Sequence, residues 1–440
     1  MIITPYTTNS KEGKERMARL AYRFQLADTS CRQAVSDILK AIHEGGDKAL
    51  LDYTRRFDAP NMTADQLQVK EEELSDAYRH VDDQLMASIR LAKERIYTFH
   101  QREMQQSWIT TREDGTITGR LVRPVEAAGL YVPGGQGGKT PLVSSVLMNG
   151  IPAAIAGVEQ RVMVTPPNAE GMVNPALLVA AQEIGIREIY KCGSAWAIAA
   201  LAYGTDTIPA VDVIVGPGNQ FVAEAKRQVA GRVGIDMIAG PSEVLIVADH
   251  NAKPPFIAAD MLAQAEHDPQ ALAILITTSP EIANRTVTEL ERQLKLLSRE
   301  DIARTSLAER GTILICNSLD EAMDMANRIA IEHLELMVND PFSWLPKIQH
   351  AGAIFLGDYS PEACGDYVAG PNHVLPTMGT ARISSALGVE TFLKKSSIIF
   401  CSRDAFLADA PHIDNLANLE GLTAHARSVS VRLDPEKEAG

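Results

Sequence analysis

Apolar residues recur every three or four positions through most of the first 110 residues, for example in 35–42 and in 78–97. This spacing predicts amphipathic helices, because it places the apolar side chains on one helical face. Thr29 and Ser30 are candidate N-caps of such a helix, and Gly45-Gly46 is a candidate stop. The first quarter of the chain is therefore predicted to be helical.

From about residue 123, short apolar runs alternate with Ala-rich helical stretches, and this alternation predicts parallel sheets covered by helices. The predicted strands are 129–132, 161–164, 188–190, 211–215, 244–247, 272–276, 312–315 and 353–356. The fold class is therefore α/β, with two Rossmann-like parallel-sheet domains of the aldehyde-dehydrogenase-like kind. Beyond about residue 380, a strand near 397–401, a helix over 404–420 and a short final strand form a predicted arm that reaches another subunit.

These patterns divide the chain into four predicted regions. They are an N-terminal arm (1–25), an α/β domain that carries the metal ligands (26–128 plus 240–380), a second α/β domain on the cofactor side (129–239) and a C-terminal dimerisation arm (381–440).

Charge and composition narrow the class of partner. The net charge is −14 and no run of Lys or Arg marks a basic face, which disfavours nucleic acid. The five cysteines are far apart and form no C-x-x-C pair, which disfavours a disulfide framework and a thiolate zinc site. No apolar segment approaches the roughly 20 residues that a bilayer requires. A cytoplasmic protein that binds no membrane is expected.

Four histidines, His267, His333, His373 and His425, lie where apolar segments give way to polar loops. Gln264 precedes His267 by three residues on a predicted helix, so both side chains leave from one face. Asp366 supplies a carboxylate in a predicted loop. Amide, imidazole and carboxylate donors without thiolate suit zinc or manganese.

Glu332 and His333 follow a predicted helix and precede a predicted strand, so the pair could lie at the rim of a sheet, where α/β proteins bind ligands. The two side chains are proton acceptors of different ordinary pKa, which suits acid and base catalysis in one site. A polar pair that simply ends a helix is the alternative reading.

Two glycine-rich loops suggest nucleotide binding. The segment 134–140 resembles a P-loop, but Pro133 occupies the position of the first glycine, which argues against a nucleotide hydrolase. The segment 216–221 follows a strand and opens a helix, but Phe221 occupies the third glycine position of the dinucleotide fingerprint. A tight turn and a modified dinucleotide site both remain open there.

Taken together, these segments resemble histidinol dehydrogenase over nearly the whole chain. The resemblance rests on motifs at 129–135, 146–152, 199–205, 216–219, 235–243, 264–267, 332–334, 365–367, 372–376 and 420–425. It implies a zinc-dependent, NAD-linked four-electron oxidation of L-histidinol to L-histidine through L-histidinal, the last steps of histidine biosynthesis.

The resemblance also implies residue roles. One zinc per subunit is held by Gln264, His267 and Asp366 together with His425 from the partner, in a homodimer with shared sites. His333 is the general base and Glu332 activates water. The substrate is held by the metal ligands and His333, and is contacted by Ser242, His373 and Glu420; NAD+ is contacted through Tyr131, Trp196 and Asn219.

Two departures from the family pattern lie on the cofactor side. Trp196 stands where the family usually has glutamine, and the loop 134–139 is about three residues longer than usual. Two alternatives therefore stay open: a paralogous zinc and NAD dehydrogenase of another small polar alcohol, and a metal- or ligand-binding protein that has lost turnover.

Overall fold

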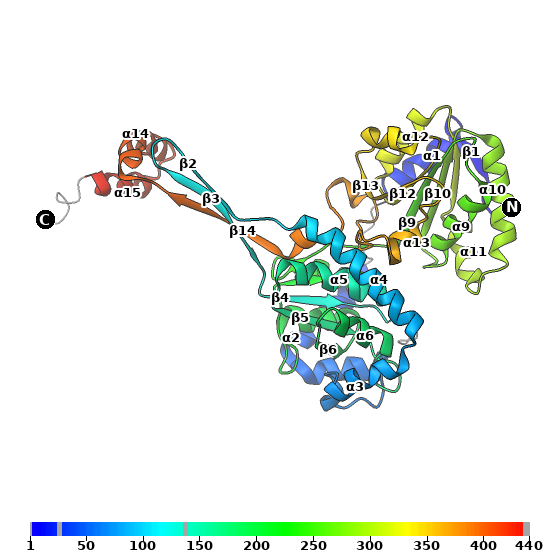
Figure 1. Cartoon of the computed structure of the whole chain (residues 1–440), viewed down its shortest axis with the longest axis horizontal. Coiled ribbons are helices and arrows are strands. Elements are labelled where there is room, and N and C mark those ends of the chain that lie inside the picture. Colours follow the sequence, from blue (N-terminus) through cyan, green and yellow to red (C-terminus); the bar gives the residue numbers. More distant parts are fainter. Residues whose placement is uncertain (1, 24–28, 135–139, 434–440) are drawn as a thin grey trace. The chain divides into compact units, whose positions relative to one another are not determined.

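The computed structural model describes residues 2–23, 29–134 and 140–433. The chain forms two compact units, one of Met1–Met104 with Val125–Phe392 and one of Gln105–Pro124 with Leu393–Gly440. The first unit contains two parallel sheets covered by helices (Figure 1). The predicted α/β class with two parallel-sheet domains is therefore confirmed.

The first sheet, sheet A, has the strand order β1-β11-β10-β9-β12-β13, and every neighbouring pair is parallel. Its strands are β1 (Pro5–Thr7), β9 (Glu243–Ala248), β10 (Leu272–Thr277), β11 (Thr312–Ile315), β12 (Ile331–Met337) and β13 (Ala351–Leu356). Its helices are α1 (Lys11–Ala21), α9 (Pro254–Ala265), α10 (Pro280–Leu294), α11 (Glu300–Glu309), α12 (Leu319–Ile329) and α13 (Glu362–Tyr367).

Alternate residues of the central strands of sheet A enter two separate cores. Val244 and Ile246 of β9 pack with α9, α10 and α11, whereas Leu245 and Val247 pack with α1 and α12. This is the period of two that a strand buried on both faces requires. Both faces of sheet A are therefore closed by helices, which leaves its strand ends to form a site.

The second sheet, sheet B, has the order β6-β5-β4-β7-β8 and is also wholly parallel. Its strands are β4 (Ala127–Tyr131), β5 (Gln160–Thr165), β6 (Glu188–Lys191), β7 (Val213–Val215) and β8 (Gly234–Ile235). The intervening helices are α5 (Val143–Ala156), α6 (Pro175–Glu183), α7 (Ser194–Tyr203) and α8 (Gln220–Val229).

The helical N-terminal region packs differently from the prediction. Three N-terminal helices are involved: α2 (Thr29–Phe57), α3 (Glu71–Ala77) and α4 (Asp83–His100). Helix α2 contacts α7 and α8, α3 contacts α6, and α4 contacts α5, and all four of these partner helices connect strands of sheet B. The prediction had grouped them with the metal-bearing domain. The predicted N-terminal arm likewise contributes β1 and α1 to sheet A. Amphipathic periodicity shows which face of a helix is buried, but not which sheet buries it.

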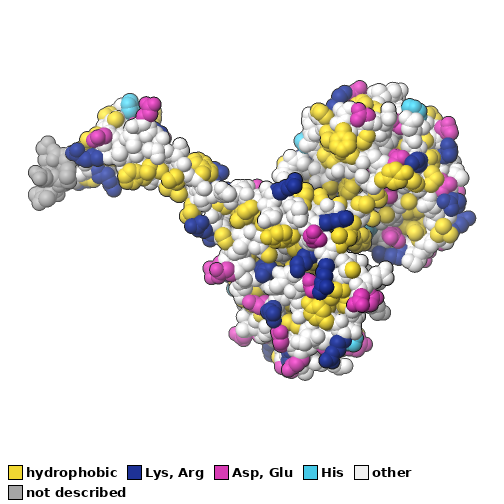
Figure 2. All heavy atoms as spheres, viewed as in Figure 1, with side chains coloured by type: hydrophobic (Ala, Val, Ile, Leu, Met, Phe, Trp, Pro, Cys, Tyr) yellow, Lys and Arg dark blue, Asp and Glu magenta, His cyan; other side chains and the backbone are white. Residues whose placement is uncertain are grey.

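The second unit is a small antiparallel sheet with two helices. The sheet order is β14-β3-β2, from β2 (Trp108–Thr111), β3 (Ile117–Pro124) and β14 (Leu393–Phe400), and the helices are α14 (Arg403–Leu419) and α15 (Thr423–Leu433). Hydrophobic side chains are exposed along this unit, including Trp108, Ile109, Ile399 and Leu419 (Figure 2). An exposed apolar surface of this kind is typical of a protein interface.

Two local predictions were wrong. Residues 331–337 form the strand β12, where no strand was predicted. The final predicted strand is the helix α15. The predicted stop at Gly45-Gly46 is confirmed, because Gly46 has the non-helical angles φ +52° and ψ −138° and separates two helices within Thr29–Phe57. No helix within the described ranges is long and apolar enough to cross a membrane.

Candidate active site

The helix α9 presents two of the predicted metal ligands. Pro254 and Pro255 occupy its first turn, where proline suits the helix, and its Ala-rich middle is buried. Its end precedes Pro269, which disfavours helical geometry at the residue before it. Gln264 lies in the last helical turn, and the amide of His267 donates to the carbonyl of Gln264 at 3.2 Å. One further turn thus keeps the His267 side chain in register with Gln264.

His267, Glu362 and Asp366 form a cluster whose potential ligand atoms all lie within 4.8 Å of one another. Glu362 and Asp366 are four residues apart on α13 and share a helical face. The prediction had placed Asp366 in a loop, whereas the structure places it in this short helix. The sequence analysis missed Glu362, although the spacing of the two carboxylates would have indicated a common face.

A hydrogen bond from the Glu362 amide anchors α13 against sheet A. The amide of Glu362 donates to Oε1 of Glu335 in β12 at 2.9 Å. Only acceptors surround one end of the buried Gln264 amide, so its nitrogen lies there and donates to the two Glu362 carboxylate oxygens at 3.0 and 3.1 Å. This orientation leaves the amide oxygen of Gln264 as the atom able to bind a cation.

Glu332 and His333 lie near the amino end of β12. The chain turns from α12 into this strand at Ala330, which has the left-handed conformation φ +51°, ψ 64°. The Nδ1 atom of His333 lies 3.0 Å from the Glu243 carbonyl oxygen, and this contact requires a proton on Nδ1. The other ring nitrogen, Nε2, is buried and has no partner in the described part of the chain.

Burial shifts the pKa of each of these groups toward its neutral form. It lowers the pKa of His333 to about 3 and raises the pKa of Asp366 to about 6. Burial also raises the pKa of Glu332 well above its ordinary value, although the hydrogen bond from the Glu243 amide opposes that shift. Several carboxylates are thus buried close together without enough positive charge, a situation that a bound cation would relieve.

This cluster lies at the amino ends of β9 and β12, not at the carboxyl ends where α/β proteins usually bind ligands. Glu243 is the first residue of β9, and His333 pairs with the next residue, Val244. The reason is that His267, at the C-terminal end of α9, and Glu362 and Asp366, on α13, all lie at this edge of the sheet. The rim prediction for the pair was therefore right about a sheet edge and wrong about which edge.

Two predicted substrate contacts are near this cluster. Ser242 directly precedes β9 and is partly buried. The Nε2 atom of His373 is buried and unpartnered among the described residues. Burial lowers the pKa of His373 and of His333, and the positive charge of His267 lowers both pKa values further. Unpartnered buried imidazole nitrogens are uncommon, and each requires an explanation such as a ligand.

The predicted cofactor contacts lie instead at the carboxyl edge of sheet B. Tyr131 ends β4, and its hydroxyl oxygen accepts from the Ser194 amide at the start of α7 at 3.1 Å. Asn219 caps α8, and its side-chain oxygen accepts from the amides of Phe221 and Val222. The tight turn expected after β7 is present, because Gly216 has φ +115°. Residues 135–139 of the longer loop lie outside the described residues.

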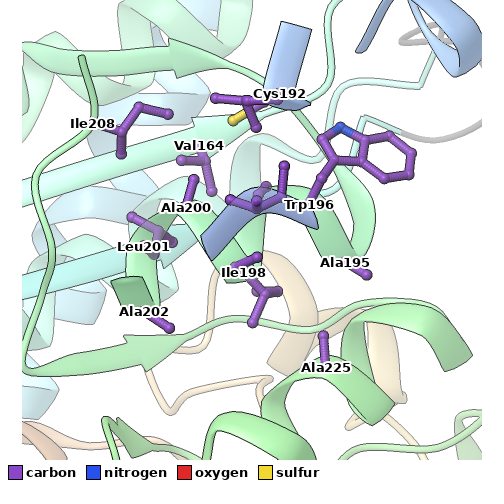
Figure 3. Close-up of a cluster of buried hydrophobic side chains, with 14 of the residues drawn as sticks. Val164, Cys192, Ala195, Trp196, Ile198, Ala200, Leu201, Ala202, Ile208 and Ala225 are labelled. Atoms are coloured by element: carbon purple, nitrogen blue, oxygen red, sulfur yellow. The ribbon is translucent and has the colours of Figure 1, made fainter. Parts of the chain in front are cut away.

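Trp196 is buried in the core of sheet B, among the side chains drawn in Figure 3. Its ring stacks with those of Tyr53 and Phe57, with centroid distances of 5.8 and 5.3 Å. Its Nε1 atom is buried and has no partner in the described ranges. The ring faces are thus used in packing, and Nε1 is the polar atom left to contact a ligand.

The last two predicted site residues belong to the second unit. Glu420 caps the C-terminus of α14, His425 lies in the first turn of α15, and both side chains are exposed. Neither has a role in the internal packing of that unit, which is consistent with contacts outside it.

Comparisons with known proteins agree over the whole chain. A sequence model described as histidinol dehydrogenase matches residues 22–433. The chain is 65% identical to a histidinol dehydrogenase of Desulfotalea psychrophila, covering 98% of this chain and 100% of the relative, and 50% identical to one of Carboxydothermus hydrogenoformans, covering 96% and 99%. The crystal structure of histidinol dehydrogenase from Elizabethkingia anophelis superposes with a TM-score of 0.92 at 37% identity, covering 99% of both chains. The chain therefore belongs to the histidinol dehydrogenase family of NAD-dependent oxidoreductases.

Proposed function

We propose that this enzyme oxidises L-histidinol to L-histidine through bound L-histidinal, with one zinc ion per subunit and two NAD+ in succession. The observation that carries the proposal is the cluster of His267, Glu362 and Asp366 in the same site as His333, whose Nε2 is buried and unpartnered. A cation site beside a neutral base suits oxidation of an alcohol.

The donor set fits zinc. Gln264, His267 and Asp366 would hold it, with His425 of the partner subunit as the fourth ligand. Imidazole, carboxylate and amide donors without thiolate also suit manganese, so metal analysis is part of the test. When bound, the ion supplies a Lewis acid that orients the basic nitrogens of the substrate. Glu362 supports this arrangement because it binds the amide nitrogen of Gln264.

His333 is proposed as the general base. Its Nδ1 proton is engaged by the Glu243 carbonyl, so Nε2 carries the free lone pair. Burial lowers the pKa of His333 to about 3, so the ring is neutral and can accept a proton throughout the physiological range. In the first half-reaction, Nε2 takes the hydroxyl proton of the substrate and the carbon-bound hydrogen leaves as hydride for NAD+, giving the aldehyde and NADH.

Glu332 is proposed to activate water in the second half-reaction. Its Oε2 accepts from the Glu243 amide at 2.7 Å, which fixes the orientation of the carboxylate. Water adds to the aldehyde carbon as one of its protons passes to Glu332, and the carbonyl oxygen takes the proton that His333 accepted in the first half-reaction. The resulting hydrate then returns a hydroxyl proton to His333 and loses a hydride. The hydride reduces a second NAD+, and the product is the carboxylic acid.

The remaining residues are proposed to bind and orient. Ser242 and His373, with Glu420 of the partner subunit, contact the substrate. Tyr131, Trp196 and Asn219 contact NAD+, since the N-termini of α7 and α8 attract phosphate at the carboxyl edge of sheet B.

A stoichiometric assay tests the reaction. Purified protein of measured metal content is incubated with limiting L-histidinol and excess NAD+, and two NADH per histidinol are expected, with L-histidine as the product. NADH formation only with other alcohols would favour a paralogous dehydrogenase. Tight histidinol binding without NADH would favour a protein that has lost turnover.

Complementation tests the shared site. His425→Ala and His267→Ala are each expected to lower zinc content and turnover. Mixed dimers of the two variants contain one intact site if His425 acts on the partner, so partial activity should return. Verified heterodimers without any recovery would exclude a shared site. Mixtures of His267→Ala with Asp366→Asn provide the control, because each change damages the site of the subunit that carries it and the mixed dimer therefore has no intact site.

A further inference from the structure

Arg23 and Glu243 form a buried ion pair beside the proposed catalytic residues. Nε and one terminal nitrogen of Arg23 donate to the two carboxylate oxygens of Glu243, both at 2.5 Å. Arg23 is 7% exposed and Glu243 is 1% exposed. Neither side chain has a part in the reaction proposed above. A buried pair of this kind adds little net stability over an apolar pair of similar size, so stability alone does not account for it.

Arg23 also holds the turn that leads into β12. Its other terminal nitrogen donates to the carbonyls of Leu20 and Ile329 at 2.8 and 2.6 Å. The terminal nitrogen that binds Glu243 also makes a weaker contact with the carbonyl of Ala330 at 3.4 Å. Ile329 ends α12, and Ala330 is the left-handed residue two positions before Glu332. The guanidinium therefore satisfies carbonyls at the point where the helix becomes the strand.

Glu243 contacts three site residues through its peptide groups. Its amide donates to Oε2 of Glu332 at 2.7 Å, and its carbonyl accepts from Nδ1 of His333 at 3.0 Å. The same carbonyl accepts from the Gln264 amide at 3.3 Å. The base, the water-activating carboxylate and one metal ligand thus all depend on the position of this one residue.

The strand ladder holds Glu243 on one side only. Glu243 pairs with Leu272 of β10. On the other side, the pairing of β9 with β12 begins at Val244 and His333, so Glu243 lies one residue beyond the paired part of that ladder. Its side chain is held by Arg23, which also binds the α12 carbonyls. The ion pair therefore ties the start of β9 to the start of β12, the two segments that carry the site.

We propose that Arg23 and Glu243 are positioning residues that set the geometry of Glu332 and His333. The inference rests on the proposed function, because it assumes the roles given to that pair. A displacement of about 1 Å in catalytic groups costs roughly 10–100-fold in rate, so loosening this contact should act mainly on kcat.

Arg23→Lys and Glu243→Asp test the proposal, since each keeps the charge and changes the geometry. Both half-reactions should slow by roughly 10–100-fold in kcat, because Glu243 holds both Glu332 and His333. The KM values should stay within about threefold, a split that general loss of stability would not produce. The kcat values are expressed per bound zinc, because the Glu243 carbonyl also accepts from Gln264. The fold reduction in kcat of the double variant should be smaller than the product of the two single reductions, because the two residues act through one contact.

A matched control uses a buried ion pair elsewhere. Lys191 and Glu73 join β6 to α3, with side chains 3% and 19% exposed. Glu73→Asp should lower the melting temperature and leave kcat within about twofold, since neither residue touches the site. The positioning role would be overturned if Arg23→Lys and Glu243→Asp kept the wild-type kcat, or if their kcat fell no further than that of Glu73→Asp.

Three further variants keep the test decisive. If the single variants fold poorly, Arg23→Met with Glu243→Gln removes both buried charges together and should fold, yet kcat should remain low. Full activity of that double variant would overturn the proposal. Glu332→Gln and His333→Asn are measured alongside: their full activity would refute the proposed function, whereas their inactivity with active Arg23 and Glu243 variants would refute only the positioning role.

Discussion

Sheets A and B share one strand order around their central strands, but the residues predicted to be functional lie at opposite ends of the two sheets. In sheet A the cluster lies at the amino ends of β9 and β12, beside the C-terminal end of α9. In sheet B the predicted cofactor residues lie at the carboxyl ends of β4 and β7, beside the N-termini of α7 and α8. Helix C-termini favour cations and helix N-termini favour anions. One topology can therefore serve a metal in one sheet and a dinucleotide in the other.

The two edges also differ in what they bury. The sheet A edge buries carboxylates and imidazoles, including Glu332 and His333. The sheet B edge buries aromatic rings, with Tyr131 and Trp196 almost fully covered. Changes in sheet A should therefore alter chemistry and metal content, whereas changes in sheet B should alter cofactor binding and stability.

The largest effect is expected from Asp366→Asn. Loss of a carboxylate ligand should lower zinc content and reduce turnover by roughly three orders of magnitude, because the metal supplies several kcal/mol of transition-state stabilisation. Calorimetry should show unchanged NAD+ affinity, since the change is confined to sheet A. Full zinc content with full activity would remove Asp366 from the metal site.

Glu332→Gln should separate the two oxidations. The aldehyde-to-acid half should slow by roughly 10²–10³-fold, the usual worth of a general acid or base, and the alcohol-to-aldehyde half should slow much less. Single-turnover experiments started from histidinol and from histidinal measure the two halves. Equal losses in both would remove the special role of this carboxylate, and His333→Asn is the comparison expected to slow the first half.

Trp196→Phe tests the sheet B side. Phenylalanine keeps a ring against Tyr53 and Phe57 and removes only the Nε1 donor. If that donor contacts NAD+, the KM for NAD+ should rise by about fivefold, because roughly one hydrogen bond to the cofactor is lost. The kcat and the zinc content should stay unchanged. Tyr53→Phe, which also preserves the stack, is the control. An unchanged KM would make Trp196 a packing residue alone.

Asp58→Asn should give the smallest effect, visible only as a function of pH. Burial raises the pKa of Asp58 to about 7 from an ordinary value of 3.8. The folded state therefore binds this proton more tightly than the unfolded state, and the resulting stability is lost as the pH rises from about 4 to 7. The variant should gain a few degrees in melting temperature relative to wild type at pH 8 and none at pH 4. An identical difference at both pH values would contradict this.

Sequence periodicity predicted the fold well wherever strands were continuous apolar runs. It missed β12 because Ile331–Met337 buries Glu332, His333 and Glu335, so a wholly buried strand had a polar pattern. The short final strand that was predicted is also absent from its expected place, since the described C-terminal residues belong to the helix Thr423–Leu433.

The local spacing of Gln264 and His267 predicted that their side chains share a helical face, and the structure places both beside Glu362. The spacing of Glu362 and Asp366 is also local and was overlooked. Arg23 and Glu243 could not be predicted in this way, because they lie far apart along the chain and only the folded structure brings them together. The roles inferred for the exposed Glu420 and His425 came from family resemblance and stay predictions.

Ala330 and Ser194 have consequences for directed evolution of this enzyme. Both are non-glycine residues at positive φ, 51° and 49°, one before β12 and one at the start of α7. Each conformation costs about 1–2 kcal/mol, and glycine would relieve that strain. Selection for heat resistance alone should therefore favour glycine at these two positions, even where the greater backbone freedom lowers activity.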